Sequence, residues 1–147
     1  MITVLLVDDH ASIRKSLQQL LEGTDDIQVL GMASSGVEAV ARASSYCPDV
    51  TVMDISMPLM DGMEATRQIR ERYPLARILM LSIYDSPGYI QRALEVGALG
   101  FVLKDNIGED LLAAIRTLFR GGRYFSQKIA VIAEAFMQQK ERDSWAG

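Results

Sequence analysis

Short, largely apolar runs alternate with longer amphipathic stretches along most of this 147-residue chain. Brief runs rich in valine and isoleucine are typical of strands that are buried on both faces, as in a parallel sheet. Because helical patterns separate these runs, the sequence predicts an α/β fold with a doubly wound, five-stranded parallel sheet and helices on both of its faces. The five runs lie at Ile2–Val7, Ile27–Met32, Val50–Met53, Ile78–Leu81 and Phe101–Leu103.

The stretches between the runs carry signals for the beginnings of helices. Three pairs have the spacing of a capping box, namely Ser35 with Glu38, Asp61 with Glu64 and Asn106 with Glu109. After five such helices, a further apolar pattern predicts an extra C-terminal helix from Gln127 to Gln139. We expect the polar stretch from Gln138 to Gly147 to be frayed.

The composition excludes several classes of protein. The formal net charge of −4 argues against nucleic-acid binding by these residues themselves. With one cysteine, Cys47, and one histidine, His10, neither a disulfide framework nor a zinc site of Cys and His ligands can form. No apolar run is long enough to cross a membrane, and the chain does not begin like a signal peptide. We therefore expect a soluble cytoplasmic protein without a membrane partner.

Polar residues follow four of the predicted strands. Asp8 and Asp9 follow the first strand, Asp54 the third, Ser82 the fourth and Lys104 the fifth. Because the carboxyl ends of parallel strands meet at one edge of a sheet, we expect these residues to share a cleft. Three carboxylates repel one another, and Mg²⁺, which binds carboxylate, water and phosphate oxygens, would relieve that repulsion. The sequence thus predicts a magnesium-dependent phosphoryl-transfer site with Asp54 as nucleophile.

Short motifs in this order and spacing resemble the receiver domain of response regulators in bacterial two-component signalling. They are Val7-Asp8-Asp9-His10, Met53 to Pro58, Asp61-Gly62, Leu81-Ser82, Gly97-Ala98 and Gly100 to Asp105. The resemblance covers residues 4 to 105 and implies a flavodoxin-like sheet with the strand order 2-1-3-4-5. It also implies a signalling phosphoprotein that is not an enzyme, since it catalyses only its own phosphorylation and dephosphorylation.

The resemblance assigns the phosphoacceptor and the metal ligands. Asp54 is similar to the aspartate that takes a phosphoryl group from the phosphohistidine of a sensor histidine kinase, and it also belongs to the metal site. Asp9 resembles a direct Mg²⁺ ligand, and Asp8 one that reaches the metal mainly through water. The backbone carbonyl of Ser56 resembles the remaining protein ligand. Lys104 is similar to the lysine that pairs with the carboxylate or the phosphoryl group.

Other residues match the switch and tuning positions of that family. Ser82 resembles the hydroxyl residue that swings toward the phosphoryl group. Phe101 matches the aromatic residue whose rotamer reports that swing, although a core aromatic with no such role fits the sequence equally well. By similarity, Ser56 and Tyr84 tune the lifetime of the phosphoryl group. Ile83 stands where a small residue is common, and its bulk is expected to slow small phosphodonors.

The resemblance extends to the receivers that precede a LuxR-type helix-turn-helix domain, on Lys104-Asp105 and on Gly122 to Ser126. We expect a receiver domain over residues 1–122 and a C-terminal helix or linker over 123–147. The Leu-Thr-x-Arg-Glu opening of the DNA-binding domain does not occur in the chain. Two interpretations stay open: a part of a longer transcription regulator that binds DNA only through its output domain, or a stand-alone receiver acting through protein contacts. The apolar stripe of the extra helix also favours a homodimer.

Two functions of other classes compete with the switch. A Mg²⁺-dependent phosphohydrolase of the haloacid-dehalogenase type would use an aspartyl nucleophile and a second aspartate two residues later, where this chain has Ser56. A flavin-binding or other small-molecule module is disfavoured, because the chain contains no glycine-rich phosphate-binding motif.

Overall fold

One parallel sheet organises the chain, with its strands in the order β2-β1-β3-β4-β5-β6. The computed structural model describes residues 1–146, with side chains as far as Ser144. The elements are β1 (Ile2–Val7), α1 (Ala11–Glu22), β2 (Ile27–Ala33), α2 (Gly36–Tyr46), β3 (Val50–Asp54), α3 (Gly62–Arg72), β4 (Ile78–Ser82), α4 (Pro87–Glu95), β5 (Gly100–Leu103), a 3₁₀ turn (Lys104–Asn106), α5 (Ile107–Phe119), β6 (Tyr124–Phe125) and α6 (Gln127–Ala146).

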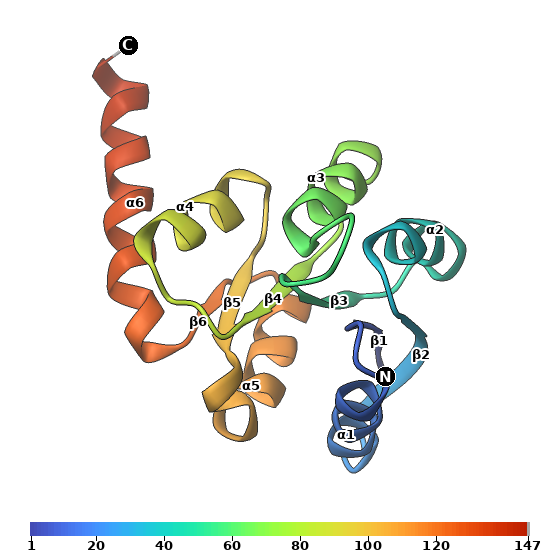
Figure 1. Cartoon of the computed structure of the whole chain (residues 1–147). Helices are drawn as coiled ribbons and strands as arrows, with labels where there is room; N and C mark the ends of the chain where they lie inside the picture. Colours follow the sequence, from blue (N-terminus) through green and yellow to red (C-terminus); the bar gives the residue numbers. More distant parts are fainter. Residues whose placement is uncertain (147) are drawn as a thin grey trace.

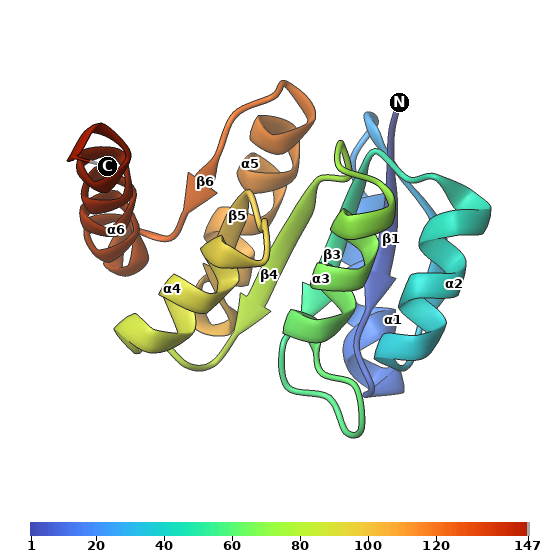
Figure 2. The same cartoon turned by 90° about the horizontal axis from the view of Figure 1, so that it is seen from above.

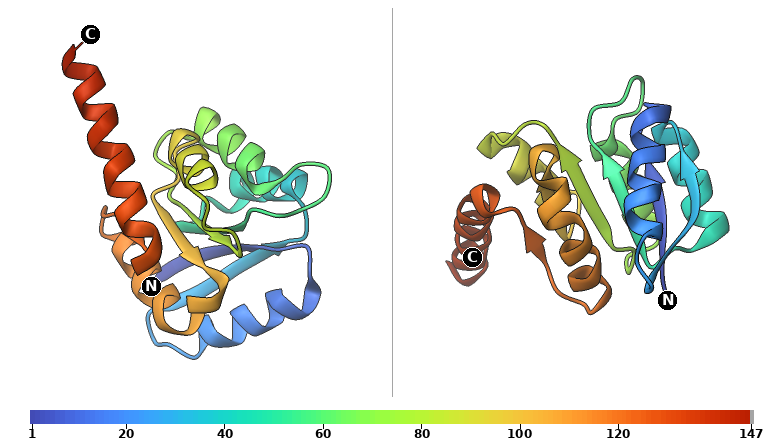
Figure 3. Two further views of the ribbon diagram at one scale, coloured as in Figure 1. Left: turned by 60° about the vertical axis from the view of Figure 1, so that its left-hand side comes forward. Right: turned by 90° about the horizontal axis from the view of Figure 1, so that it is seen from below.

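The helices lie in two layers, as the doubly wound pattern predicts. Helices α1 and α5 cover one face of the sheet, and α2, α3 and α4 cover the other (Figure 1, Figure 2). The predicted strand order is confirmed for the first five strands. Helix α6 stands beyond the β6 edge of the sheet, and its C-terminal part extends past the other helices (Figure 3).

The two faces of the sheet bury different apolar side chains. Under α1 and α5, the buried residues are all isoleucine, leucine, valine or alanine. The face under α2, α3 and α4 is rich in methionine, and we call it the methionine layer. It contains the buried residues Met53, Met57, Met63 and Met80, and the partly buried Met60 and Met137 pack against it.

Two of the three predicted capping boxes are confirmed in their N-cap half, while the carboxylates of Glu38 and Glu64 bond to other side chains. Ser35 Oγ accepts the N–H of Glu38 at 3.1 Å, and Asp61 Oδ1 accepts the N–H of Glu64 at 2.9 Å. The third prediction is wrong, because Asn106 makes no side-chain capping bond. Asn106 instead ends the 3₁₀ turn that leads directly from β5 into α5.

The C-terminal region corrects two expectations. The sheet has a sixth strand, β6, which pairs in parallel with β5 and covers an edge that would otherwise be unpaired. A strand of two residues is too short to show a periodic pattern. Helix α6 continues to Ala146, past the predicted end at Gln139, because the Gln, Lys, Glu and Arg residues there are good helix formers. The fraying expected from Gln138 stays a prediction, and Gly147, the last residue of that stretch, lies outside the described residues.

The first half of α6 packs against the body of the domain. Ile129 and Ala133 are buried in the methionine layer, with Ile132 partly buried beside them, and α6 lies next to α4. Much of the predicted apolar stripe is therefore covered within the chain. In the part of the chain that the structure describes, no helix is both long and apolar enough for a bilayer crossing.

Asp110 on α5 joins β6 to the start of α6. Its Oδ1 accepts the hydroxyl of Tyr124 at 2.7 Å, and its Oδ2 accepts the hydroxyl of Ser126 at 3.1 Å. The hydrogen bond to the Asp110 carboxylate, together with burial and the nearby negative charge, raises the pKa of Tyr124 to about 12.

The substitution Asp110→Asn is expected to return the pKa of Tyr124 toward the usual value of 10.0, because it replaces the carboxylate that accepts the Tyr124 hydrogen bond with a weaker neutral acceptor and removes the negative charge that opposes phenolate formation. Since the folded-state pKa is the higher one, this contribution to stability is complete below pH 10.0 and is lost as the pH rises through about 12. Ultraviolet absorbance of the phenolate follows the titration of the tyrosines with pH. The part of the curve that is missing in Tyr124→Phe belongs to Tyr124. A late-titrating tyrosine that persists in Asp110→Asn would contradict this assignment.

Candidate functional site

The carboxyl ends of the strands bring the predicted acidic residues together. Strands β1 and β3 are neighbours, with Val7 opposite Met53, so the residues that follow, Asp8 and Asp54, lie side by side. Both are almost completely buried, each with 1% of its surface exposed. Asp9 is partly exposed at the beginning of the turn into α1. Three carboxylates therefore share one edge of the sheet, as predicted.

Lys104 supplies a positive charge to this cluster. It follows β5, and its Nζ lies 3.0 Å from Asp54 Oδ1 and 3.6 Å from Asp8 Oδ2. Burial raises the pKa of Asp54 and the charge of Asp8 adds to this, so the net shift is upward although Lys104 opposes it. Burial lowers the pKa of Lys104, but the two carboxylates outweigh it and hold that pKa above its usual value. One ammonium thus offsets only part of the negative charge.

His10 and Arg14 contact the acidic residues, and the sequence pattern gave no role to either. His10 Nδ1 lies 3.2 Å from Asp8 Oδ1 and 3.0 Å from Asp9 Oδ1, although most of the imidazole is exposed. Arg14 Nη1 donates to the backbone carbonyl of Asp8 at 2.6 Å. Because His10 directly follows Asp8 and Asp9 in the sequence, a contact between its imidazole and their carboxylates could have been predicted. Arg14 is one turn into α1, where sequence spacing alone does not indicate which way it points.

The arrangement of the carboxylates fits a divalent cation. One ligand atom each from Asp8, Asp9, His10 and Asp54 can be chosen so that all lie within 4.8 Å of one another. Asp8 Oδ2, Asp9 Oδ1 and Asp54 Oδ2 are buried and accept no well-aligned hydrogen bond among the described residues; the nearest nitrogens given for two of them are Lys104 Nζ, 3.6 Å from Asp8 Oδ2, and His10 Nδ1, 3.0 Å from Asp9 Oδ1. Buried carboxylate oxygens that accept no well-aligned hydrogen bond are costly, and a cation between them would satisfy all three. Oxygen ligands of this kind are those that Mg²⁺ prefers.

The loop between β3 and α3 encloses Asp54 from one side. The backbone N–H of Ser56 lies 3.4 Å from Asp54 Oδ1, at the long end of hydrogen bonding. The N–H of Gly62 donates to the carbonyl of Ile55 at 2.9 Å, which folds the loop back onto the strand. Leu59, at the tip, has a φ of +66° and a fully exposed side chain. The close approach at Gly62 leaves no space for a side chain.

The predicted switch and tuning residues lie around β4 and β5. Ser82 is buried at the end of β4, and its Oγ accepts the N–H of Tyr84 at 2.9 Å. The Phe101 ring is buried in the methionine layer. Ile83 is 62% exposed, whereas the ring of Tyr84 stacks on that of Tyr89 with centroids 5.3 Å apart. In register, Ser82 lies opposite Leu103, next to Lys104.

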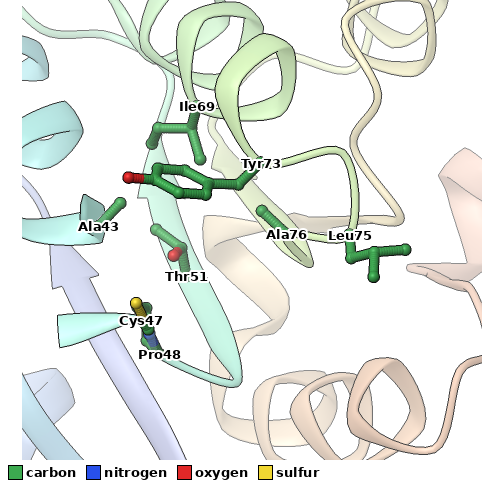
Figure 4. Close-up of a pocket in the computed structure, with 8 residues that line it drawn as sticks. All are labelled: Ala43, Cys47, Pro48, Thr51, Ile69, Tyr73, Leu75 and Ala76. Atoms are coloured by element: carbon green, nitrogen blue, oxygen red, sulfur yellow. The ribbon is translucent and has the colours of Figure 1, made fainter. Parts of the chain in front are cut away.

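A separate apolar pocket of about 170 Å³ lies between α2 and α3 (Figure 4). Its lining includes Cys47, Thr51, Ile69 and Tyr73, and the loops that precede β3 and β4 close it. This pocket is therefore at the amino ends of the strands, opposite the edge that carries the acidic cluster. None of the predicted site residues lines it.

Comparison with known proteins places this arrangement in a family. The model of the response regulator receiver domain matches residues 4–116. The oxygen regulatory protein NreC of Staphylococcus carnosus (strain TM300) is 36% identical over 143 residues, which cover 96% of this chain and 66% of NreC. The transcriptional regulatory protein DegU of Brevibacillus brevis is 35% identical over 128 residues, which cover 87% of this chain and 54% of DegU. The chain thus spans less than two thirds of the length of these relatives.

Solved structures agree with the sequence comparison. The crystal structure of a LuxR-family two-component response regulator from Aurantimonas sp. SI85-9A1 has a TM-score of 0.86 at 33% identity, over 90% of this chain and 95% of that one. The response regulator domain of Thermotoga maritima CheB has a TM-score of 0.77 at 34% identity, over 82% and 97% of the two chains. With its acidic cluster, its strand order and these relatives, the chain belongs to the family of response regulator receiver domains.

Proposed function

We propose that this receiver is a phosphorylation-controlled switch that accepts a phosphoryl group on Asp54 from a sensor histidine kinase. The observation that carries the proposal is the environment of Asp54, which is buried beside Asp8 with Lys104 Nζ 3.0 Å away. A carboxylate held next to a cation, with one oxygen free of hydrogen bonds, is suited to form an aspartyl phosphate.

In the proposed reaction, a carboxylate oxygen of Asp54 forms the bond to phosphorus. The bond between phosphorus and the imidazole nitrogen of the kinase phosphohistidine breaks, and that nitrogen keeps the electron pair. Lys104 stays beside the acceptor and offsets the negative charge of the phosphoryl oxygens. Hydrolysis of the aspartyl phosphate returns the domain to its starting state, so we propose no activity beyond this cycle.

We propose that Asp9 and Asp54 bind Mg²⁺ directly, that Asp8 acts mainly through water, and that the backbone carbonyl of Ser56 is the remaining protein ligand. When bound, Mg²⁺ neutralises the carboxylates and the incoming phosphoryl oxygens. His10 contacts both Asp8 and Asp9, and it would help to hold their carboxylates in place.

The switch itself is proposed to begin at Ser82. If its hydroxyl turns toward the phosphoryl group, the N–H of Tyr84 loses its acceptor and the segment before α4 must rearrange. Phe101 would then change rotamer within the methionine layer. Ser56 and Tyr84 are proposed to tune the lifetime of the phosphoryl group, and the exposed Ile83 to slow small phosphodonors.

We propose that residues 1–122 form the receiver domain and that residues 123–147 lead to an output domain. The relatives are longer than the matched region, and DegU is named a transcriptional regulatory protein, which supports control of transcription through a DNA-binding domain. A stand-alone receiver acting through protein contacts is the alternative. A homodimer stays a prediction, which sedimentation velocity with and without phosphorylation can test.

Incubation with acetyl phosphate and Mg²⁺ is expected to add the mass of one phosphoryl group to the intact protein, and Asp54→Asn is expected to prevent the gain. The reaction should require Mg²⁺, because the clustered carboxylates otherwise repel the donor. Asp25→Asn is the matched control, since Asp25 is an exposed aspartate in the loop between α1 and β2, and it should keep the full gain. A phosphorylated histidine kinase serves as a second donor in case Ile83 excludes the small one.

An unchanged mass with both donors would contradict the proposed function. A mass gain in Asp54→Asn equal to that of the wild type would contradict the choice of acceptor. Continuous turnover of a generic phosphate ester would instead favour the phosphohydrolase, whose second aspartate this chain lacks at Ser56.

A further inference from the structure

We infer that Ser126 couples the state of the Asp54 site to helix α6 through strand β5. The inference rests on the proposed function, because the state of the site is its phosphorylation. Ser126 is completely buried and lies directly before α6, outside the acidic cluster. The phosphoryl chemistry proposed above gives it no role.

Ser126 binds β5 at two points. Its backbone N–H donates to the carbonyl of Phe101 at 3.0 Å, and its Oγ accepts the N–H of Leu103 at 3.0 Å. Leu103 directly precedes Lys104, whose ammonium contacts the carboxylates of Asp54 and Asp8. Two hydrogen bonds therefore hold Ser126 to the strand that presents Lys104 to the site.

The same serine begins α6. Its carbonyl accepts the N–H of Ile129 at 2.8 Å and that of Ala130 at 2.9 Å, which are the first bonds of the helix. A serine in this position usually caps its own helix with its side chain. Here the hydroxyl accepts from β5 and donates to Asp110 on α5 instead. This use of the hydroxyl makes Ser126 a connection between elements.

We call the Leu103 N–H, Asp110, Tyr124 and Ser126 the β5–α6 clasp. The two carboxylate oxygens of Asp110 accept from Tyr124 and Ser126, so the Ser126 hydroxyl both donates and accepts. Buried polar groups that are fully hydrogen-bonded do not move independently, because each movement leaves a group unpaired. The end of β5 can shift only if Ser126 moves with it or the clasp breaks.

Phosphorylation of Asp54 increases the negative charge next to Lys104, which directly follows β5. A phosphoryl group on Asp54 adds anionic oxygens beside the Lys104 ammonium, and the main chain at Leu103 is one residue away. A displacement there reaches Ser126 and the first turn of α6 through the clasp. Because coupling between two sites is reciprocal, breaking the clasp must also change how the site responds.

Hydrogen–deuterium exchange of the α6 amides in the whole chain tests this coupling. Mg²⁺ is present throughout, beryllium fluoride serves as the phosphoryl mimic, and fluorine NMR measures its binding separately. In the wild type, loading the site is expected to change exchange in the first turns of α6 by about fivefold, the lower end of ordinary coupling between sites. In Ser126→Ala, α6 is expected to exchange faster in both states and to lose its response to loading.

Two further variants separate coupling from simple loosening of the helix. Ile129→Val removes a buried methyl group from α6 but leaves the clasp intact, so exchange should rise while the response to loading persists. Tyr124→Phe removes only the hydrogen bond from the Tyr124 hydroxyl to Asp110, and it should weaken the change in α6 exchange on loading. If Ser126→Ala does not fold, Tyr124→Phe becomes the variant that tests the coupling.

Each outcome bears on a different statement. Binding of the mimic with unchanged α6 exchange in the wild type would overturn the coupling and leave the proposed function standing. A full response in Ser126→Ala, or an Ile129→Val response lost as completely as that of Ser126→Ala, would also overturn it. Failure of the mimic to bind the wild type would overturn the proposed function, and this inference with it.

Discussion

The substitution Asp9→Asn is expected to abolish the stabilisation of this domain by Mg²⁺. Binding to the folded state alone should raise the free energy of unfolding of the wild type by about 2.7 kcal/mol at roughly one hundred times the Kd. Asp9 Oδ1 is one of the three buried oxygens that accept no well-aligned hydrogen bond among the described residues, and His10 Nδ1 lies 3.0 Å from it. Asparagine has nearly the same shape as aspartate but lacks the charge, so the substitution should weaken Mg²⁺ binding without changing the packing.

Urea unfolding with and without Mg²⁺ measures this effect. Without metal, Asp9→Asn should be at least as stable as the wild type, because one of three mutually repelling carboxylates is gone. Asp25→Asn, far from the cluster, should retain the full gain from Mg²⁺. A gain of wild-type size in Asp9→Asn would show that Asp9 is not a ligand.

The second large effect is expected from Gly62→Ala. A Cβ at this position would overlap the carbonyl oxygen of Asp54 and lie 2.9 Å from Cα of Ile55. Both are main-chain atoms of the segment that carries the phosphoacceptor, so no side-chain rotation can relieve the overlap. We expect a loss of about 3 kcal/mol in the free energy of unfolding, at the upper end of ordinary overpacking. Phosphorylation should slow as well, because Asp54 must shift.

Gly88→Ala is the matched control for this substitution. Gly88 lies in the first turn of α4, and a Cβ there would meet nothing within 4 Å. Alanine is the better helix former, so this variant should gain roughly 0.5–1 kcal/mol. In urea unfolding, Gly62→Ala should lower the free energy of unfolding and Gly88→Ala should raise it. Equal stabilities of Gly62→Ala and the wild type would mean that the loop after β3 can open without cost.

The sequence predicts the sheet and the site from the same physical rule. Strands that are buried on both faces are apolar along their whole length, and parallel strands all end at one edge. Asp8, Asp54 and Lys104 could therefore be placed together without knowing any side-chain contact. The roles of Ser82 and Phe101 stay predictions, because they concern a second state of the domain.

Features without a repeating pattern could not be predicted in this way. Strand β6 has two residues, and it forms only because its backbone pairs with the edge of β5, a strand far from it in sequence. Asn106 has the right spacing for a cap, but the 3₁₀ turn before α5 leaves its side chain without that bond. The hydroxyl of Ser126 bonds to a residue 23 positions earlier in the chain, a distance at which local sequence carries no signal.

The methionine layer gives the two faces of the sheet different mechanical properties. Methionine is unbranched and adjusts its side-chain torsions at little cost, whereas the branched residues under α1 and α5 have few alternatives. Rearrangement around Phe101 or α4 can thus be absorbed by repacking on one side, while the opposite layer keeps the sheet rigid. The same asymmetry makes one face chemically vulnerable. Oxidation of buried thioethers to sulfoxides would disrupt the methionine layer, whereas among the described residues the buried side chains of the opposite layer include no methionine and the partly buried Met32 packs against it.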